Sequence, residues 1–167
     1  MTPADLLVTR WGVRFMGRHI PASIGRGGIT TAKREGDGAT PTGTHRITGV
    51  LYRPDRLSRA HMPEWAQPIG LRDIWSDDPR DPAYNLLGVA PSAYSHETLR
   101  RADPLYDIAL LTDWNWPDAT PGEGSAIFLH QWRRPGFPTE GCVAFSRANL
   151  LWIVKRLMPE TRVIVRG

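Results

Sequence analysis

A histidine and the only cysteine of the chain, His130 and Cys142, stand twelve residues apart at the ends of apolar segments. The run 126–129 leads into His130, and a loop containing proline and glycine returns the chain to Gly141, Cys142 and a second apolar run. A strand, a loop and a returning segment can bring the imidazole beside the thiol. An adjacent imidazole and nearby positive charge lower the pKa of a thiol and supply the thiolate that attacks a carbonyl carbon. The spacing therefore predicts acyl-transfer chemistry at Cys142.

Gly141 lets the backbone approach the reacting carbon closely, and the N–H groups near Gly141 and Cys142 are candidates to hold an oxyanion. The alternative is that His130 and Cys142 are core residues at neighbouring strand ends, since a single cysteine is commonly a small buried hydrophobe. One cysteine excludes an internal disulfide and a cysteine-rich zinc site. Papain-like peptidases are also disfavoured, because they place the cysteine before the histidine.

Short apolar runs bounded by Gly, Pro and Asp predict a domain built mainly from strands. We expect one long helix over Arg147–Met158, capped by Ser146 and stopped by Pro159. The segment Ser95–Arg101 is expected to form a short helix or turn. The order of elements indicates one α+β domain over residues 1–167, predominantly antiparallel β, with its main helix near the C-terminus. The expected strands are Leu6–Thr9, Val13–Phe15, Ile20–Ile24, Thr44–Tyr52, Tyr106–Trp114, Ser125–His130 and Thr161–Val165.

Residues 53–92 contain six prolines and little periodicity, which predicts a long irregular surface excursion. A loop of this length in a compact domain usually serves function or is an insertion particular to a family. The acidic residues Asp77, Asp78 and Asp81 fall inside it, and their spacing matches no EF-hand. We therefore interpret them as part of a solvated loop and expect no metal.

The chain of 167 residues carries 19 Arg and two Lys against 17 acidic residues, for a net charge of +4. Arginine pairs bidentately with carboxylate and phosphate, so this composition favours anionic ligands. Acidic residues are interspersed throughout, and no basic tail indicates a nucleic-acid partner. No apolar run reaches the length of a membrane span. The charges of Asp5, Arg10 and Arg14 exclude a secretory signal within residues 1–15 as they stand, which leaves open a mature form whose leader has been removed.

Three segments together resemble the L,D-transpeptidase catalytic domain family (YkuD-type). Residues 139–143, Thr-Glu-Gly-Cys-Val, resemble its Ser/Thr-x-Gly-Cys signature, with His130 upstream. Residues 37–44 are similar to its Thr-Pro-x-Gly segment before a strand, and residues 122–130 to the lead-in to its catalytic histidine. The resemblance covers about Gly28 to Val165 and implies the β-sandwich-like fold of that family.

The resemblance implies that Cys142 is the nucleophile, which takes the acyl group of a peptidoglycan tetrapeptide stem as a thioester. It implies that His130 is the base, oriented by a backbone carbonyl, and that Gly141 and the Cys142 amide form the oxyanion region. The family needs no metal or cofactor, transfers the acyl group to an amine, and is inactivated by carbapenems. It also implies a location in the periplasm or cell wall, and we expect a monomer.

The chain departs from the family pattern around the nucleophile. Glu140 stands where a histidine is common, Ala144 stands where an arginine is common, and the interval from His130 is short. We hypothesise that Arg133 or Arg134 takes over a contact to a substrate carboxylate by bidentate pairing. Thr139 and Glu140 are candidate substrate contacts because they flank the nucleophile. The departures leave 3→3 and 1→3 cross-links, attachment of another amine, and hydrolysis open.

Two further residues are candidates for the walls of the cleft. His96 precedes the basic pair Arg100-Arg101, and it either lines the donor or acceptor site or has a surface or capping role. Trp114 precedes the catalytic strand, and it either walls the cleft or packs in the interior.

Three functions remain open, and we favour the first. The first is a cysteine-dependent L,D-transpeptidase. The second uses the same nucleophile with water as acceptor, as an L,D-carboxypeptidase or endopeptidase, because the two differ only in how well the acceptor pocket excludes water. The third is a non-enzymatic, Arg-rich module that binds an anionic polymer, with Cys142 simply buried. Only the first two require the Cys142 thiol.

Overall fold

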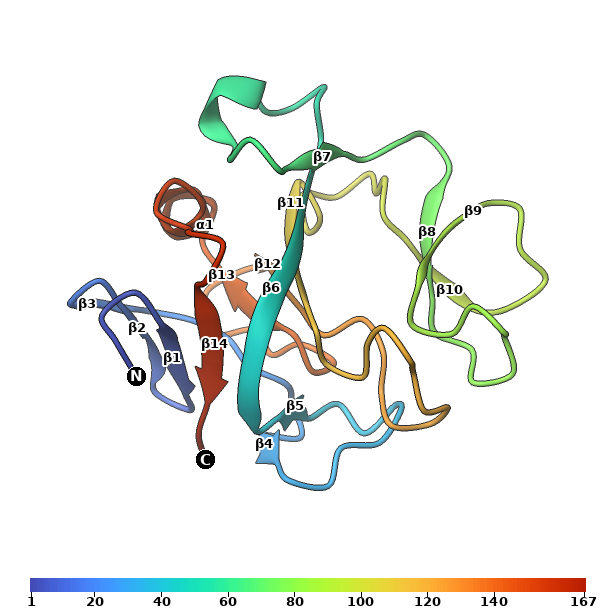
Figure 1. Ribbon diagram of the computed structural model, residues 1–167, viewed down its shortest axis with the longest axis horizontal. Coiled ribbons are helices and arrows are strands. Elements are labelled where there is room, and N and C mark those ends of the chain that lie inside the picture. Colours follow the sequence, from blue (N-terminus) through green and yellow to red (C-terminus); the bar gives the residue numbers. More distant parts are fainter.

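The computed structural model describes all 167 residues and is dominated by strands. The largest sheet has the strand order β13-β12-β11-β6-β14-β1-β2-β3, with β7 paired to β6 off this path (Figure 1). A three-stranded sheet, β10-β8-β9, and a two-stranded sheet, β4-β5, complete the fold. The elements are β1 (Leu6–Thr9), β2 (Gly12–Phe15), β3 (Arg18–Ile20), β4 (Ile29–Thr30), β5 (Thr40–Pro41), β6 (Gly43–Tyr52), η1 (Arg59–His61), β7 (Gln67–Pro68), β8 (Asp73–Ser76), β9 (Leu87–Val89), β10 (His96–Thr98), β11 (Ile108–Thr112), β12 (Phe128–Gln131), β13 (Val143–Phe145), α1 (Arg147–Val154) and β14 (Arg162–Val165).

The long strand β6 joins the two halves of the large sheet. Its first residues pair with β14, and residues 47–52 pair with β11. Most strand pairs are antiparallel, and β12–β13, β1–β14, β6–β7 and β4–β5 are the parallel ones. The expected α+β class, with antiparallel sheet and one helix near the C-terminus, is confirmed. None of the helices has the length and apolar character that crossing a membrane requires.

Several predicted boundaries were wrong. The helix ends at Val154 and not at Met158, because the amides of Arg156 and Leu157 bond three residues back and tighten its end into turns. The strand expected over Ile20–Ile24 ends at Ile20, where Pro21 supplies no N–H for a ladder. The helix or turn expected over Ser95–Arg101 is instead a strand, β10, which pairs with β8.

The last three residues of β6 (residues 50–52) and the strands β11 and β12 are buried on both faces, whereas the first half of β6 alternates between exposed and buried residues. Alternate residues point to opposite sides of a strand, so Val50, Leu110 and Leu129 enter the main core beneath α1. Their neighbours Leu51 and Phe128 face a second, smaller core on the other side. Because both faces of these strands are covered, they read in the sequence as continuous apolar runs and not as alternating ones.

The excursion over residues 53–92 is more ordered than the sequence predicts. Figure 1 shows that its strands β8 and β9 form a small sheet with β10, lying to one side of β6 and β11. Trp75 of β8 is buried and packs edge-on against Phe128 of β12, with ring centroids 4.9 Å apart. Ile69 and Leu99 join the same apolar cluster. The excursion therefore covers the second face of the sheet, where it shields the end of β12.

Asn85 ties this excursion to the segment that precedes β12. Its side chain is buried, and its Oδ1 accepts the indole N–H of Trp75 at 2.9 Å and the amide of Ala126 at 3.0 Å. Its amide nitrogen donates to the carbonyls of Trp114 and Asn115. Asn85 has a φ of 59°, a left-handed conformation that asparagine tolerates better than most residues.

We predict that Asn85→Ala destabilises the protein by about 3 kcal/mol, because it leaves buried donors and acceptors without partners and places alanine at positive φ. Chemical denaturation monitored by Trp fluorescence measures the change. Asn149→Ala is the matched control, since Asn149 makes only an exposed side-chain bond to Arg18. An equal loss of stability in both variants would show that the buried hydrogen bonds of Asn85 contribute no more than an exposed one.

Candidate active site

The pairing of β12 with β13 places the two sequence-predicted catalytic residues on one face of the sheet. The strands are parallel, with Leu129 opposite Val143 and His130 opposite Ala144. Extending this register puts Cys142 opposite Phe128. Since side chains two residues apart on a strand share a face, His130 and Cys142 point to the same side. His130 lies within the paired strand β12, and Cys142 directly precedes Val143, the first paired residue of β13.

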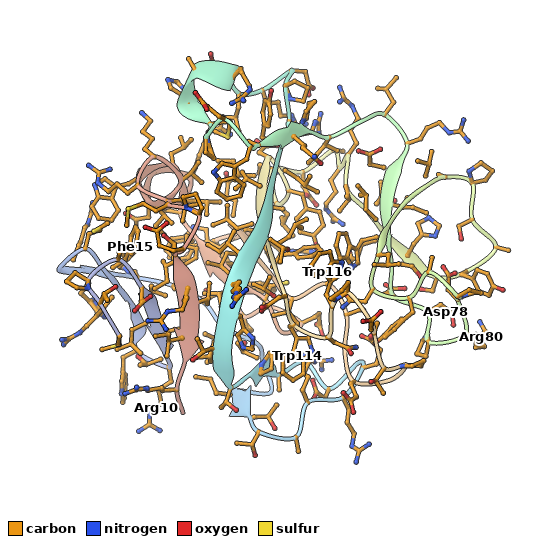
Figure 2. The ribbon with its side chains drawn as sticks, in the orientation of Figure 1. Arg10, Phe15, Asp78, Arg80, Trp114 and Trp116 are labelled. Carbon is orange, nitrogen blue, oxygen red and sulfur yellow. The ribbon has the colours of Figure 1, made fainter.

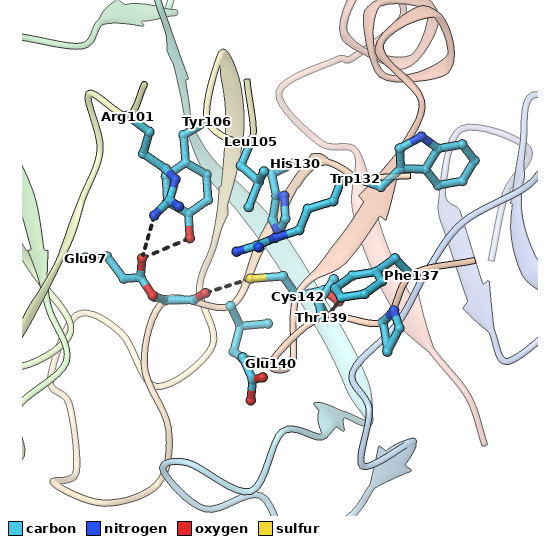
Figure 3. A pocket seen from close by; sticks show the side chains of 14 residues that line it. Glu97, Arg101, Leu105, Tyr106, His130, Trp132, Phe137, Thr139, Glu140 and Cys142 are labelled. Carbon is cyan, nitrogen blue, oxygen red and sulfur yellow. Dashed lines mark hydrogen bonds and ion pairs between the residues drawn. The ribbon is translucent and has the colours of Figure 1, made fainter. Parts of the chain in front are cut away.

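The thiol of Cys142 is nearly buried and hydrogen-bonded on both sides. Sγ donates to the carbonyl of Ala126 at 3.0 Å and accepts the amide of Phe128 at 3.4 Å (Figure 3). Burial raises the pKa of the Cys142 thiol to about 12, and the charge of Glu97 acts in the same direction. The Phe128 amide and Lys33 oppose this rise without cancelling it. Cys142 is therefore a neutral thiol at physiological pH.

The imidazole of His130 is buried, and its tautomer is determined by the backbone. Nδ1 lies 2.8 Å from the carbonyl of Gln131, which has no proton to give, so Nδ1 carries the proton and Nε2 is a free acceptor. The ring of Tyr106 packs edge-on against it, with centroids 5.3 Å apart. Burial lowers the pKa of His130 to about 4, partly offset by the Gln131 carbonyl. The imidazole is neutral above that pH.

These two pKa values correct the sequence-based expectation of an ionised thiol. The sequence predicted that the imidazole and nearby positive charge lower the pKa of Cys142. Burial dominates instead, because removing a charge from water costs more than these neighbours return. The site holds a neutral thiol near a neutral base, and a proton must move when the sulfur attacks. Activity should accordingly fall on acidification only near pH 4, below the ordinary imidazole range.

The loop before Cys142 is held by two threonines. Thr40 of β5 is completely buried, and its hydroxyl donates to the carbonyl of Gly141 at 2.8 Å. The hydroxyl of Thr139 donates to the carbonyl of Cys142 at 2.6 Å and accepts the amide of Gly141 at 3.2 Å. Gly141 has a φ of 138°, and a Cβ there would lie 2.8 Å from the carbonyl oxygen of Ala39. Glycine is required by both the conformation and the contact.

The amides around the nucleophile differ in availability. The N–H of Gly141 is engaged by Thr139. The N–H of Cys142 makes no hydrogen bond within the chain. Of the two amides that the sequence suggests for an oxyanion, the one on Cys142 is thus free to donate.

A pocket of about 370 Å³ opens over the thiol and the imidazole (Figure 3). His130 and Cys142 line it together with residues between 97 and 106, residues of the segment before β12, and residues of the loop after β12. The other lining residues are Glu97, Arg101, Leu105, Tyr106, Ala126, Ile127, Trp132, Arg133, Phe137, Pro138, Thr139 and Glu140.

Three of the candidate substrate contacts from the sequence line this pocket, and three do not. Arg133, Thr139 and Glu140 line it, and Glu140 is paired with Arg26 at 2.8 Å on the exposed side. Arg133 has no hydrogen-bond or ion-pair partner within the chain. Three others lie outside the lining: Arg134 over the ring of Phe137, His96 against the carbonyl of Tyr94, and Trp114 beside His45 at the lower end of β6 (Figure 2).

Sequence reasoning missed the pocket residues contributed by β10 and by the segment between β10 and β11. Glu97 of β10 accepts the Tyr106 hydroxyl at 3.4 Å and lies 3.9 Å from Arg101. These residues lie more than twenty residues before His130, outside the segments that resemble the family. The only sequence feature that points to them is an acidic and a basic residue, Glu97 and Arg101, four positions apart.

The structure contains no group of three or more His, Cys, Asp or Glu side chains with the geometry of a metal site. The groups able to do chemistry in the pocket are the thiol, the imidazole, the free amide and the charged rim. This combination has the parts of a cysteine acyltransferase: nucleophile, base and oxyanion donor.

A known protein family matches most of the chain. The sequence model of the YkuD family, described as the L,D-transpeptidase catalytic domain, matches residues 6–165. The chain therefore belongs to the YkuD family of L,D-transpeptidase catalytic domains, a family associated with peptidoglycan and the cell wall. Neither the curated proteins nor the solved structures that were searched include a match to it.

We predict that the buried imidazole of His130 makes folding less favourable in acid. Its pKa is about 4 in the folded chain and 6.5 in the unfolded one. Between these values the unfolded chain binds a proton that the folded chain does not, so the free energy of unfolding falls as the pH falls. At 1.36 kcal/mol per pKa unit, the loss is about 3 kcal/mol across this window.

His130→Gln removes this contribution, so its stability depends less on pH than that of the wild type. Urea denaturation at several pH values from 4 to 7 measures the difference, and His61→Gln, at an exposed position, is the control. If the wild type and His130→Gln lose stability in parallel, the imidazole is not excluded from water as described.

Proposed function

We propose that the protein is a peptidoglycan L,D-transpeptidase that joins peptide stems through a thioester on Cys142, with His130 as the base. The observation that carries this proposal is the convergence of the two side chains on one pocket, with Nε2 of His130 free because Nδ1 is engaged by Gln131. Membership of the YkuD family supports the same reaction class. A place in the periplasm or cell wall, where peptidoglycan lies, is part of the proposal.

In the acylation step, the thiol leaves its bond to the Ala126 carbonyl and gives its proton to Nε2 of His130. Sγ of Cys142 forms a bond to the carbonyl carbon of the donor stem. The negative charge on the carbonyl oxygen is held by the free amide of Cys142. The C–N bond to the terminal residue of the stem then breaks, and that residue leaves with the proton from His130. The proton moves during attack because neither group is ionised beforehand.

In the transfer step, an acceptor amine attacks the thioester carbon. His130 takes a proton from the attacking nitrogen and returns it to the sulfur as the C–S bond breaks. Water entering instead would give a shortened stem, so the outcome depends on what occupies the pocket at this moment. Arg133 stands unpaired at the rim and is suited to a substrate carboxylate, with Thr139 and Glu140 beside it.

We predict that tetrapeptide stems acylate the wild type at Cys142 and yield cross-linked dimers. Incubation with purified muropeptides followed by mass analysis of protein and products tests this directly. Cys142→Ala should form no adduct and lose activity at least a thousandfold, because no other thiol exists in the chain. A carbapenem should add its mass to the wild type alone.

The products discriminate among the candidate functions. Shortened stems without dimers would replace transfer by hydrolysis at the same cysteine. Absence of any adduct on a folded wild type would overturn the enzyme, and salt-sensitive binding of an anionic polymer unaffected by Cys142→Ala would identify a binding module instead.

We also predict that Arg133→Ala raises the KM for the donor stem about tenfold, the size of one charge-assisted hydrogen bond. The rate of carbapenem acylation at saturation should change little, because the thiol and imidazole are untouched. Arg134→Ala is the matched comparison, since Arg134 lies outside the lining. Steady-state kinetics with equal effects in both variants, or none in either, would remove the assigned role of Arg133.

A further inference from the structure

Glu97 is a carboxylate that β10 brings into the pocket of Cys142. It lies on β10, next to β8, and lines the same pocket as the thiol and the imidazole (Figure 3). Its Oε2 accepts the hydroxyl of Tyr106, while Oε1 makes no hydrogen bond within the chain. About a third of its side chain is exposed. One carboxylate oxygen is therefore available to a ligand beside the reacting sulfur.

The charge of Glu97 is only partly compensated by the chain. Arg101 is its nearest cation at 3.9 Å, but the guanidinium of Arg101 is bonded at both Nε and Nη2 to Asp103. Burial and the charge of Asp77 raise the pKa of Glu97, the response expected of an anion short of positive partners. A cationic ligand would supply the missing charge.

The second carboxylate of the pocket is different. Glu140 is largely exposed and already paired with Arg26. Its charge is thus both screened by solvent and neutralised within the chain. Of the two acidic side chains in the lining, Glu97 is the one with the burial and the vacant oxygen needed to select a cation.

We propose that Glu97 binds the ammonium group of the acceptor and so favours transfer of the acyl group to an amine over its hydrolysis. This inference rests on the proposed function and specifies the acceptor as a primary amine that is protonated in solution. The contact is a charge-assisted hydrogen bond from N–H to Oε1, which places the nitrogen in the pocket that holds the thioester.

The bound ammonium releases one proton to solvent, and the electron pair left on nitrogen forms the bond to the thioester carbon. His130 takes a second proton from that nitrogen. The C–S bond breaks, its electron pair stays on the sulfur of Cys142, and His130 returns the proton to it. The products are an amide, a thiol and one proton in water.

The test compares acceptors of different charge on the same acyl-enzyme. The donor is a tetrapeptide stem, and the acceptors are methylamine, a cation at neutral pH, and hydroxylamine, which is uncharged. Mass analysis gives the ratio of transfer to hydrolysis for each acceptor. In Glu97→Gln, which keeps the size and the bond to Tyr106, the ratio for methylamine should fall about tenfold. The ratio for hydroxylamine should change little, and acylation of Cys142 by a carbapenem should keep its rate.

Glu64→Gln is the matched control, because Glu64 is an exposed glutamate outside the pocket. It should leave both ratios unchanged. If the acyl-enzyme forms and Glu97→Gln keeps the wild-type ratio for methylamine, the role of Glu97 is overturned while the transpeptidase stands. If the wild type forms no acyl-enzyme with the donor, the proposed function falls and this inference falls with it.

A measurement on the wild type alone guards against a folding defect in the variant. Added salt weakens the attraction between a partly exposed carboxylate and an ammonium group. The ratio of transfer to hydrolysis should therefore decline with ionic strength for methylamine and stay level for hydroxylamine. Equal salt dependence for the two acceptors would contradict selection by charge.

Discussion

The parallel pairing of β12 with β13 is the constraint on which the site depends. It fixes the register that turns His130 and Cys142 to one face, and a slip of one residue would send one of them to the opposite core. Thr40 and Thr139 each make a hydrogen bond to the backbone of Gly141 and so hold the loop before Cys142 in place. The candidate catalytic pair is therefore positioned within and directly beside a paired ladder, which leaves the neighbouring side chains free to shape the pocket.

The same burial that positions the pair also determines its protonation. A sheet covered on both faces excludes water from the sulfur and the ring, and exclusion of water favours the neutral form of each. An ion pair would need compensating charge that this pocket does not provide close to the sulfur. Reactivity must then arise during attack, when the substrate itself completes the surroundings of the developing charges.

The excursion changes an open sheet face into a pocket with its own chemistry. Trp75 anchors it to β12 and Asn85 ties it to Ala126, whose carbonyl accepts the thiol proton. Its strand β8 pairs with β10, which places Glu97 in the lining of the site. A segment that reads as an irregular surface loop thus supports the sulfur and positions a charged side chain beside it.

The sequence by itself determined the strand-rich class, the helix before the last strand, and the pair His130 and Cys142. These features follow from local patterns. Short apolar runs predict strands, a capping serine predicts the start of the helix, and residues 139–143 with His130 upstream form a motif of nearby residues. It did not determine the order of the small sheet or that Glu97 meets the pocket. Nor could it reveal that burial raises the pKa of the thiol, against the local expectation. Those features depend on segments distant in the chain, and only tertiary packing decides which of them meet and how much water remains between them.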